Sequence, residues 1–173
     1  MSPERIVTPR YCQLCGRYLV ERYVPQEART RYLCEGCGFV HYVNPRVVTS
    51  VIVERDRRLL LQQRAIDPRL GYWTFPGGFL EVGETTQEGA VRETKEETGI
   101  DVTLSGLVGV YTRPRAGIVL VVYEGRSDDG EPFAADAESS AVRWFAIDDI
   151  PWRELAFETT EAALRDWVAA RAS

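Results

Sequence analysis

One segment, residues 78–100, constrains the fold and chemistry of this chain more than any other because it combines glycines with closely spaced glutamates. It reads GFLEVGETTQEGAVRETKEETGI. Thr85 and Glu88 have the spacing of a capping box, in which each side chain satisfies the other residue's backbone N–H. Gly99 stands where a helix commonly ends in a left-handed residue. The sequence therefore predicts a helix from about Thr85 to Thr98.

Three glutamates of this predicted helix share one face. Glu96 and Glu97 follow Glu93 by three and four residues, a spacing that places side chains about 5–6 Å apart, where like charges repel. Arg92 can pair with Glu96, but one guanidinium does not balance three carboxylates. Such a cluster suits Mg²⁺ or Mn²⁺, which bind carboxylate oxygens together with substrate phosphates. A solvated acidic helix face is the alternative for these residues taken alone.

The spacing across the whole segment resembles a family signature. Gly78 is followed after five residues by Glu84 and, after seven more, by the run RETKEETGI that starts at Arg92. This pattern resembles the signature of the Nudix hydrolases, which cleave nucleoside diphosphates linked to another moiety. Thr94 is the one departure, since an aliphatic residue is usual there. The resemblance implies an α/β fold, an α/β/α sandwich around a mixed sheet.

The resemblance also implies which residues bind metal. Glu93, Glu96 and Glu97, with a backbone carbonyl of Gly77 or Gly78, are expected to hold one or more Mg²⁺ or Mn²⁺ ions. The ions neutralise a diphosphate and lower the pKa of a bound water. Water then attacks phosphorus.

Other charged residues take supporting roles in this scheme. Glu93 or Glu97 is the first candidate for the general base, and Glu138 on a later loop is the alternative. Arg92 is expected to orient the glutamates, with a plain surface salt bridge as the competing interpretation. Glu84 is either an auxiliary ligand or an anchor for the turn.

All four cysteines lie near the N-terminus, as Cys12, Cys15, Cys34 and Cys37 in the motifs CQLCG and CEGCG. Two CxxC pairs separated by eighteen residues match a four-thiolate zinc site. Iron is the main rival and disulfides are the remaining alternative. Four thiolates leave zinc no open position, so the predicted site is structural. His41, the only histidine, is expected to pack or lie at the surface, and histidine-dependent triads are improbable.

Length and charge bound the organisation of the chain. Its 173 residues, 45% of them hydrophobic, suit one domain with a small extra module. We expect a zinc ribbon over residues 1–45 and a Nudix hydrolase domain over residues 46–173. No Ser/Gly linker separates them, so the ribbon is expected to be packed on the larger domain or closely tethered to it.

Composition also limits the classes of partner that the chain is expected to bind. The net charge of −5 makes nucleic acid an improbable partner. No apolar run reaches the length of a membrane span and no secretory signal is evident, so a cytoplasmic protein is expected. A small nucleotide is the expected substrate, and a homodimer is possible because ribbons in related enzymes contribute to dimers.

Apolar runs after the ribbon predict several strands and a terminal helix, which together indicate an α/β sandwich and agree with the mixed sheet that the resemblance implies. The first two strands form a hairpin across a turn at Asp56 and Arg57. The predicted strands are Val47–Val53, Leu59–Gln63, Val102–Tyr111, Ile118–Glu124 and Val142–Ile147, and the helix is Glu158–Ala170.

Further motifs bear on the substrate. The cysteine ribbon, the Asn44-Pro45 turn and the later run Leu155-Ala156-Phe157 are similar to the zinc-ribbon branch of Nudix proteins, which includes NADH, FAD and ADP-ribose pyrophosphatases. The Ser-Gln-Pro-Trp type motif of the NADH-cleaving enzymes is missing. ADP-ribose and FAD are therefore the leading substrates by resemblance.

The loop after the helix offers candidate phosphate ligands. Arg113 and Arg115 flank Pro114, and a fork-shaped guanidinium suits phosphate oxygens; a solvated loop is the alternative. Trp73 is expected to anchor the core, whereas Phe157 could serve the core or the substrate.

Two functions from other classes compete with hydrolysis. A nucleotide-sensing regulator that does not cleave its ligand is disfavoured because Glu93, Glu96 and Glu97 are intact. A zinc-ribbon nucleic-acid adaptor is disfavoured because the chain as a whole is acidic.

Overall fold

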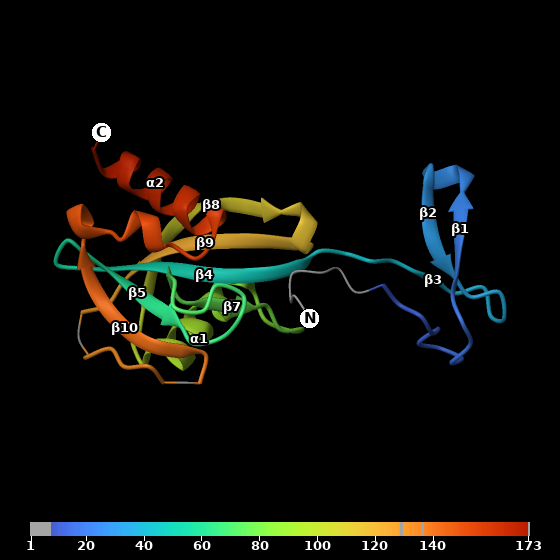
Figure 1. Ribbon diagram of the computed structural model, residues 1–173, viewed down its shortest axis with the longest axis horizontal. Coiled ribbons are helices and arrows are strands. Elements are labelled where there is room, and N and C mark those ends of the chain that lie inside the picture. Colours follow the sequence, from blue (N-terminus) through green and yellow to red (C-terminus); the bar gives the residue numbers. More distant parts are fainter. Residues whose placement is uncertain (1–7, 129, 136, 173) are drawn as a thin grey trace.

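The computed structural model describes residues 8–128, 130–135 and 137–172. It contains two sheets and two α-helices, and Figure 1 shows their arrangement. Residues 1–7 of the predicted ribbon lie outside the described residues. The elements are, in chain order, β1 (Val20–Val24), η1 (Pro25–Glu27), β2 (Arg29–Leu33), β3 (Val40–His41), β4 (Arg46–Arg55), β5 (Arg58–Arg64), β6 (Trp73–Thr74), β7 (Gly77–Phe79), α1 (Thr86–Thr98), β8 (Thr103–Arg113), η2 (Pro114–Ala116), β9 (Ile118–Arg126), β10 (Ser139–Ala146), η3 (Ile147–Asp149), η4 (Trp152–Glu154) and α2 (Glu158–Ala172).

The larger sheet is mixed, as the family resemblance implied. Its strands run in the order β10-β5-β4-β9-β8, with short β6 on β5 and short β7 on β4. Strand β4 pairs in parallel with β9, while its pairs with β5 and β7 are antiparallel. Each predicted strand lies within or overlaps β4, β5, β8, β9 or β10, and the β4–β5 hairpin is confirmed. Both positions of the predicted turn, Asp56 and Arg57, have positive φ.

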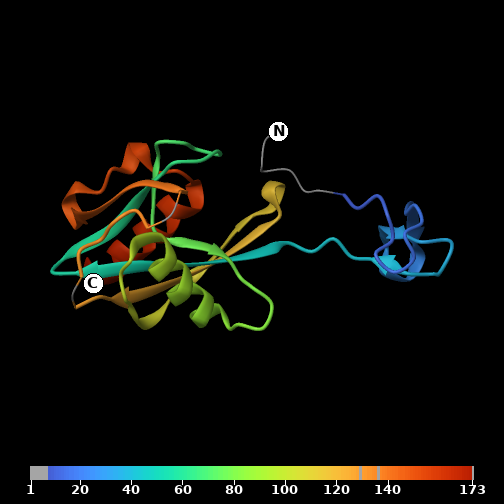
Figure 2. The ribbon, with the colours of Figure 1, turned by 90° about the horizontal axis from the view of Figure 1, so that it is seen from below.

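Two helices cover opposite faces of this sheet because the apolar residues of its strands alternate. In β4, Ile52 packs into the same core as Leu164 of α2. Its neighbours Val51 and Val53 point the other way and pack with Ala90 of α1. Figure 2 shows α1 in front of the sheet and α2 behind it. The predicted α/β/α sandwich is confirmed.

The cysteine-bearing part of the chain forms its own three-stranded antiparallel sheet, β1-β2-β3. Figures 1 and 2 both show this small sheet standing apart from the larger one and joined to it through residues 42–45, just before β4. Of the two expected arrangements, packed on the larger domain or closely tethered to it, these views show the short tether. The fold of the small sheet depends on its own cysteines and strands. The connecting residues alone do not determine whether the small sheet contacts the larger one.

No helix among the described ranges, which omit residues 1–7, 129, 136 and 173, is both long and apolar enough to cross a lipid bilayer.

Candidate active site

Helix α1 begins and ends as its sequence predicts. The Thr85 side chain accepts a hydrogen bond from the Glu88 backbone N–H, and the Glu88 carboxylate accepts one from the Thr85 N–H at 2.7 Å. Gly99 ends the helix with φ of 71°. Thr94, the departure from the family pattern, is fully buried and donates its hydroxyl hydrogen to the carbonyl of Ala90 at 2.8 Å. Its polar group is therefore satisfied and fits the core.

The glycine loop lies directly against the glutamate face of α1. In β7, Gly77 pairs with Ser50 and Gly78 with Thr49 of β4. The Gly77 N–H donates to the Glu97 carboxylate at 2.7 Å. A Cβ added to Gly78 would collide with the carboxylate of Glu93. The structure thus brings together both predicted glycines and two of the predicted glutamates, with no room for a side chain between them.

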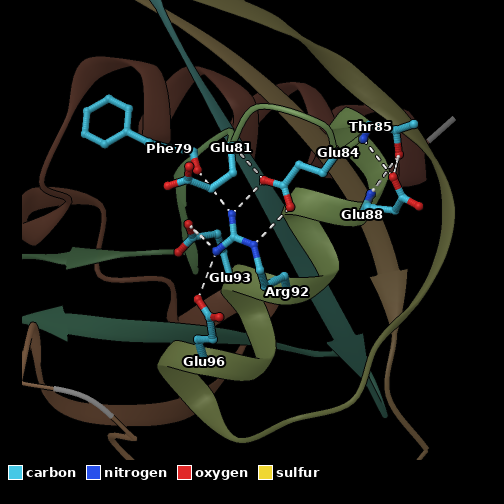
Figure 3. Close-up of polar contacts among 8 residues, drawn as sticks. All are labelled: Phe79, Glu81, Glu84, Thr85, Glu88, Arg92, Glu93 and Glu96. Carbon is cyan, nitrogen blue, oxygen red and sulfur yellow. Dashed lines mark hydrogen bonds and ion pairs between the residues drawn. The ribbon is translucent and has the colours of Figure 1, made fainter.

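Arg92 is the centre of an ion-pair network on this face, which Figure 3 shows. Its guanidinium donates to Glu84 at 2.7 and 3.0 Å, to Glu93 at 2.9 Å and to Glu96 at 2.9 Å. It also donates to the backbone carbonyl of Phe79 at 3.2 Å. The predicted pair with Glu96 is present as one of several contacts, so Arg92 ties the glycine loop to the helix.

Glu84 anchors the turn before the helix. Its carboxylate accepts from Arg92 and from the backbone N–H of Glu81 at 2.7 Å. The hydrogen bond with Arg92, followed by the one with the Glu81 backbone, lowers the pKa of Glu84 to about 2. The same contact, first among several, raises the pKa of Arg92 above its usual value. Of the two predicted roles for Glu84, these contacts describe the anchor.

The carboxylates facing the cleft are suited to a divalent cation. Burial, as the largest cause, raises the pKa of Glu93, although Arg92 opposes the shift. Glu97 is only 7% exposed. One guanidinium therefore contacts three carboxylates, and Glu97 lies on the same helix, so carboxylates outnumber this guanidinium on the glutamate face. Mg²⁺ needs only one or two protein carboxylates, because water and substrate phosphates fill its other positions, so the donor set fits it.

The predicted metal ligands line one cleft with a volume of about 570 Å³. Its volume lies within the roughly 300–1,000 Å³ that is typical of small-ligand sites. Of the predicted substrate contacts, Arg113 and Glu138 line the cleft, whereas Arg115 is not among the described residues that do. Arg115 lies in the short helix η2, which turns the chain between β8 and β9. Glu93, Glu96, Glu97, Gly77 and Gly78 all line the cleft.

Sequence reasoning missed two cleft arginines and did not settle the role of one aromatic residue. The Arg46 guanidinium carbon lies 4.5 Å from the centroid of the Phe79 ring. Arg64 and Arg113 lie over the ring of Phe157, at 5.3 and 4.4 Å. Arg46 and Arg64 occur at the ends of strands without a distinctive local motif, so no signal in the sequence indicated them.

Trp73 proved to be a core residue, as predicted. It is 6% exposed and meets Phe145 edge to face, with 4.9 Å between the ring centroids.

The four cysteines converge at the turns that flank the strands of the small sheet. Their sulfur atoms all lie within 4.8 Å of one another, with 3.7 Å between Cys12 and Cys37 and 3.4 Å between Cys15 and Cys34. A tetrahedron with Zn–S bonds of about 2.3 Å has sulfurs about 3.8 Å apart, so the geometry fits zinc. Within the described ranges it is the only group of three or more His, Cys, Asp or Glu with so compact a set of ligand atoms, and His41 lies outside it. The glutamates of α1 form an open arrangement instead.

Comparison with known proteins agrees with these features. The NUDIX domain family matches residues 44–168, and the family described as Nudix N-terminal, a zinc ribbon, matches residues 10–43. The chain is 35% identical to an ADP-ribose pyrophosphatase of Methanocaldococcus jannaschii over 131 residues, which are 73% of this chain and 75% of that protein.

Two further comparisons agree with the family match. The chain is 32% identical to the NAD-capped RNA hydrolase NudC of Vibrio cholerae over 83% of its own length and 52% of the relative's, so it spans about half of that protein. A NUDIX hydrolase structure from Nitrosomonas europaea superposes with a TM-score of 0.89 and 35% identity, covering 95% of this chain and 93% of the other.

Proposed function

The chain belongs to the Nudix hydrolase family, and from that premise we propose that it is a metal-dependent pyrophosphohydrolase. Its substrate is a nucleoside diphosphate linked to another moiety, with ADP-ribose or FAD as the leading candidates. The observation that supports this most is the contact between the glutamate face of α1 and the Gly77-Gly78 loop inside a ligand-sized cleft.

The residues of the cleft have separate parts in the proposed reaction. Glu93, Glu96 and Glu97, with a carbonyl of Gly77 or Gly78, hold Mg²⁺ or Mn²⁺, which when bound neutralises the diphosphate and activates water. Arg92 fixes the directions of Glu93 and Glu96 through its hydrogen bonds.

A carboxylate must accept the proton of the attacking water. Glu93 suits this role because it lines the cleft and because burial, as the largest cause, raises its pKa, which makes its carboxylate a stronger base. Glu97 is the second candidate and is held in place by the Gly77 N–H. Glu138 lines the cleft from the loop before β10 and is the alternative.

The names of two relatives support the substrate class. One is an ADP-ribose pyrophosphatase and the other an NAD-capped RNA hydrolase. ADP-ribose, FAD and NAD all contain a pyrophosphate bridge between a nucleoside and a second group. An RNA body on the substrate is disfavoured by the net charge of −5.

The small sheet is proposed to be a structural zinc module. Four thiolates from Cys12, Cys15, Cys34 and Cys37 complete a tetrahedron and leave no position for a reacting water. The chemistry therefore resides in the larger sheet.

Turnover of a substrate panel tests the proposal. Purified protein with Mg²⁺ is incubated with ADP-ribose, FAD, NAD⁺, NADH and an NAD-capped RNA, and the released mononucleotides are measured. Glu97→Gln should lower kcat at least about 100-fold, the scale of losing one charge-stabilising group. Glu161→Gln is the matched control, since that glutamate pairs with Arg165 on the surface of α2.

Two results would count against this function. Near-normal turnover by Glu97→Gln would refute the assignment of the metal-binding face. Tight nucleotide binding by the Mg²⁺-loaded protein with no cleavage of any panel member would instead support a nucleotide-sensing protein.

A further inference from the structure

Two arginines and one phenylalanine from distant parts of the chain meet in the cleft. Arg64 ends β5, Arg113 ends β8, and Phe157 immediately precedes α2. The guanidinium carbons lie 5.3 and 4.4 Å from the centroid of the Phe157 ring, and all three residues line the cleft. The ring of Phe157 therefore makes cation–π contacts with two guanidinium groups.

Stacking on the ring restricts where each guanidinium can point. Arg64 is held further, because its Nε donates to the carbonyl of Pro68 at 2.8 Å. A guanidinium keeps its charge when it is partly buried, and its planar fork matches the oxygens of a phosphate group. The pair thus places two positive charges in the cleft, and the ring of Phe157 restrains both guanidinium groups.

The surroundings of the pair include both signs of charge. Burial is the main cause that lowers the pKa of Arg64, and the nearby carboxylates of Glu138 and Glu97 oppose it. The first turn of α2 adds Thr159 and Thr160 to the same side of the cleft. Because a helix N-terminus carries partial positive charge, it adds to the field of the two arginines.

We propose that Phe157 is a positioning residue, which sets Arg64 and Arg113 as a clamp for a phosphate group of the substrate. The clamp acts without the metal and lies on the side of the cleft formed by β5, β8 and α2. The proposed metal-binding glutamates belong to α1. The clamp rests on the proposed function only for the class of substrate, a nucleotide. Arg115 is excluded from the clamp although it stands two residues from Arg113, because it does not line the cleft.

Equilibrium binding measured without metal tests phosphate binding by the clamp independently of hydrolysis. Binding of AMP and of adenosine to the full chain is measured by calorimetry in EDTA, so that turnover does not occur. The zinc content of the protein is measured in parallel, to detect any zinc loss. The wild-type protein should bind AMP at least tenfold more tightly than adenosine. Arg113→Ala should weaken AMP binding about tenfold or more, the scale of a charge-assisted hydrogen bond, and leave adenosine binding unchanged. Arg115→Ala is the matched control and should bind both ligands as the wild type does.

Variants of the ring test its positioning role. Phe157→Leu should weaken AMP binding about three- to tenfold by removing the cation–π contacts, and Phe157→Tyr, which keeps a ring, should restore it. Thermal unfolding of each free variant shows whether its fold is kept, and Arg113→Ala carries the test if Phe157→Leu does not fold.

Three results would overturn the clamp. These are equal affinity of the wild type for AMP and adenosine, equal AMP binding by Arg113→Ala and Arg115→Ala, and wild-type AMP binding by a folded Phe157→Leu. Each leaves hydrolysis of the substrate panel standing, so failure of the clamp is distinguishable from failure of the proposed function.

Discussion

Adding one methyl group at Gly78 should disable the site without changing any charge. The backbone of Gly78 lies outside the left-handed region, so alanine is allowed there, but its Cβ would collide with the carboxylate of Glu93. The nearest atoms must retreat by on the order of 1 Å to reach ordinary contact, and a displacement of this size can reduce turnover about 10²-fold. Such a loss corresponds to about 2.7 kcal/mol of transition-state stabilisation.

The assay compares kcat/KM of Gly78→Ala with that of Gly106→Ala, using whichever panel substrate the wild type cleaves. Gly106 lies in β8, where an added Cβ would meet the Glu124 carboxylate at 3.2 Å, a contact that a flexible side chain can relieve. Gly106→Ala should stay within about threefold of wild type, as expected for substitutions away from the site. Binding of Mn²⁺ should weaken only in Gly78→Ala. Turnover by Gly78→Ala within threefold of wild type would refute the contact between the loop and Glu93 as the reason for glycine there.

Three other predictions concern stability and metal. Leu164→Ala, in the fully buried core beneath α2, should lower the free energy of unfolding by about 2–5 kcal/mol, measured by urea titration; a loss below 1 kcal/mol would contradict the packing described. Cys34→Ser should abolish stoichiometric zinc, measured by elemental analysis, while kcat changes little; retention of one zinc per chain would argue against a four-thiolate site. The pKa of Glu84 is depressed to about 2 from 4.5, so its pair with Arg92 stabilises the fold fully above pH 4.5, and that stability is lost as pH falls through about 2. Unfolding of Glu84→Gln should therefore differ from wild type at pH 6 and converge with it near pH 2, and a difference that persists at pH 2 would count against the ion pair.

The helix that carries the glutamates could be predicted from the sequence because its determinants are local. The capping pair Thr85 and Glu88, the terminal Gly99 and the spacing of Arg92 from Glu96 act over at most four residues. Alternating apolar residues likewise predicted the strands. The cysteines were predicted to converge because CxxC spacing already fixes each pair.

Arg113 was the only arginine of the cleft that the sequence indicated, because the others depend on contacts between distant segments. Arg64 and Phe157 are ninety-three positions apart and meet only after β5 and α2 have packed. Arg113 and Arg115 are the same residue type on one turn, and only the three-dimensional course of that turn distinguishes them. The sequence left open whether the small sheet packs on the larger domain or is only tethered to it, since it shows the length of the tether and not whether two surfaces meet.

The backbone and the side chains of strand β4 have different roles. The backbones of Thr49 and Ser50 pair with Gly78 and Gly77, while Val48 is one of the residues that line the cleft. Backbone pairing depends little on side-chain identity, so a change at Val48 reshapes the surface that a ligand touches and leaves the register of the loop intact. Substrate preference in this scaffold can therefore diverge through mutation of residues such as Val48 that line the cleft, while the glycine loop and the glutamate helix are inherited unchanged.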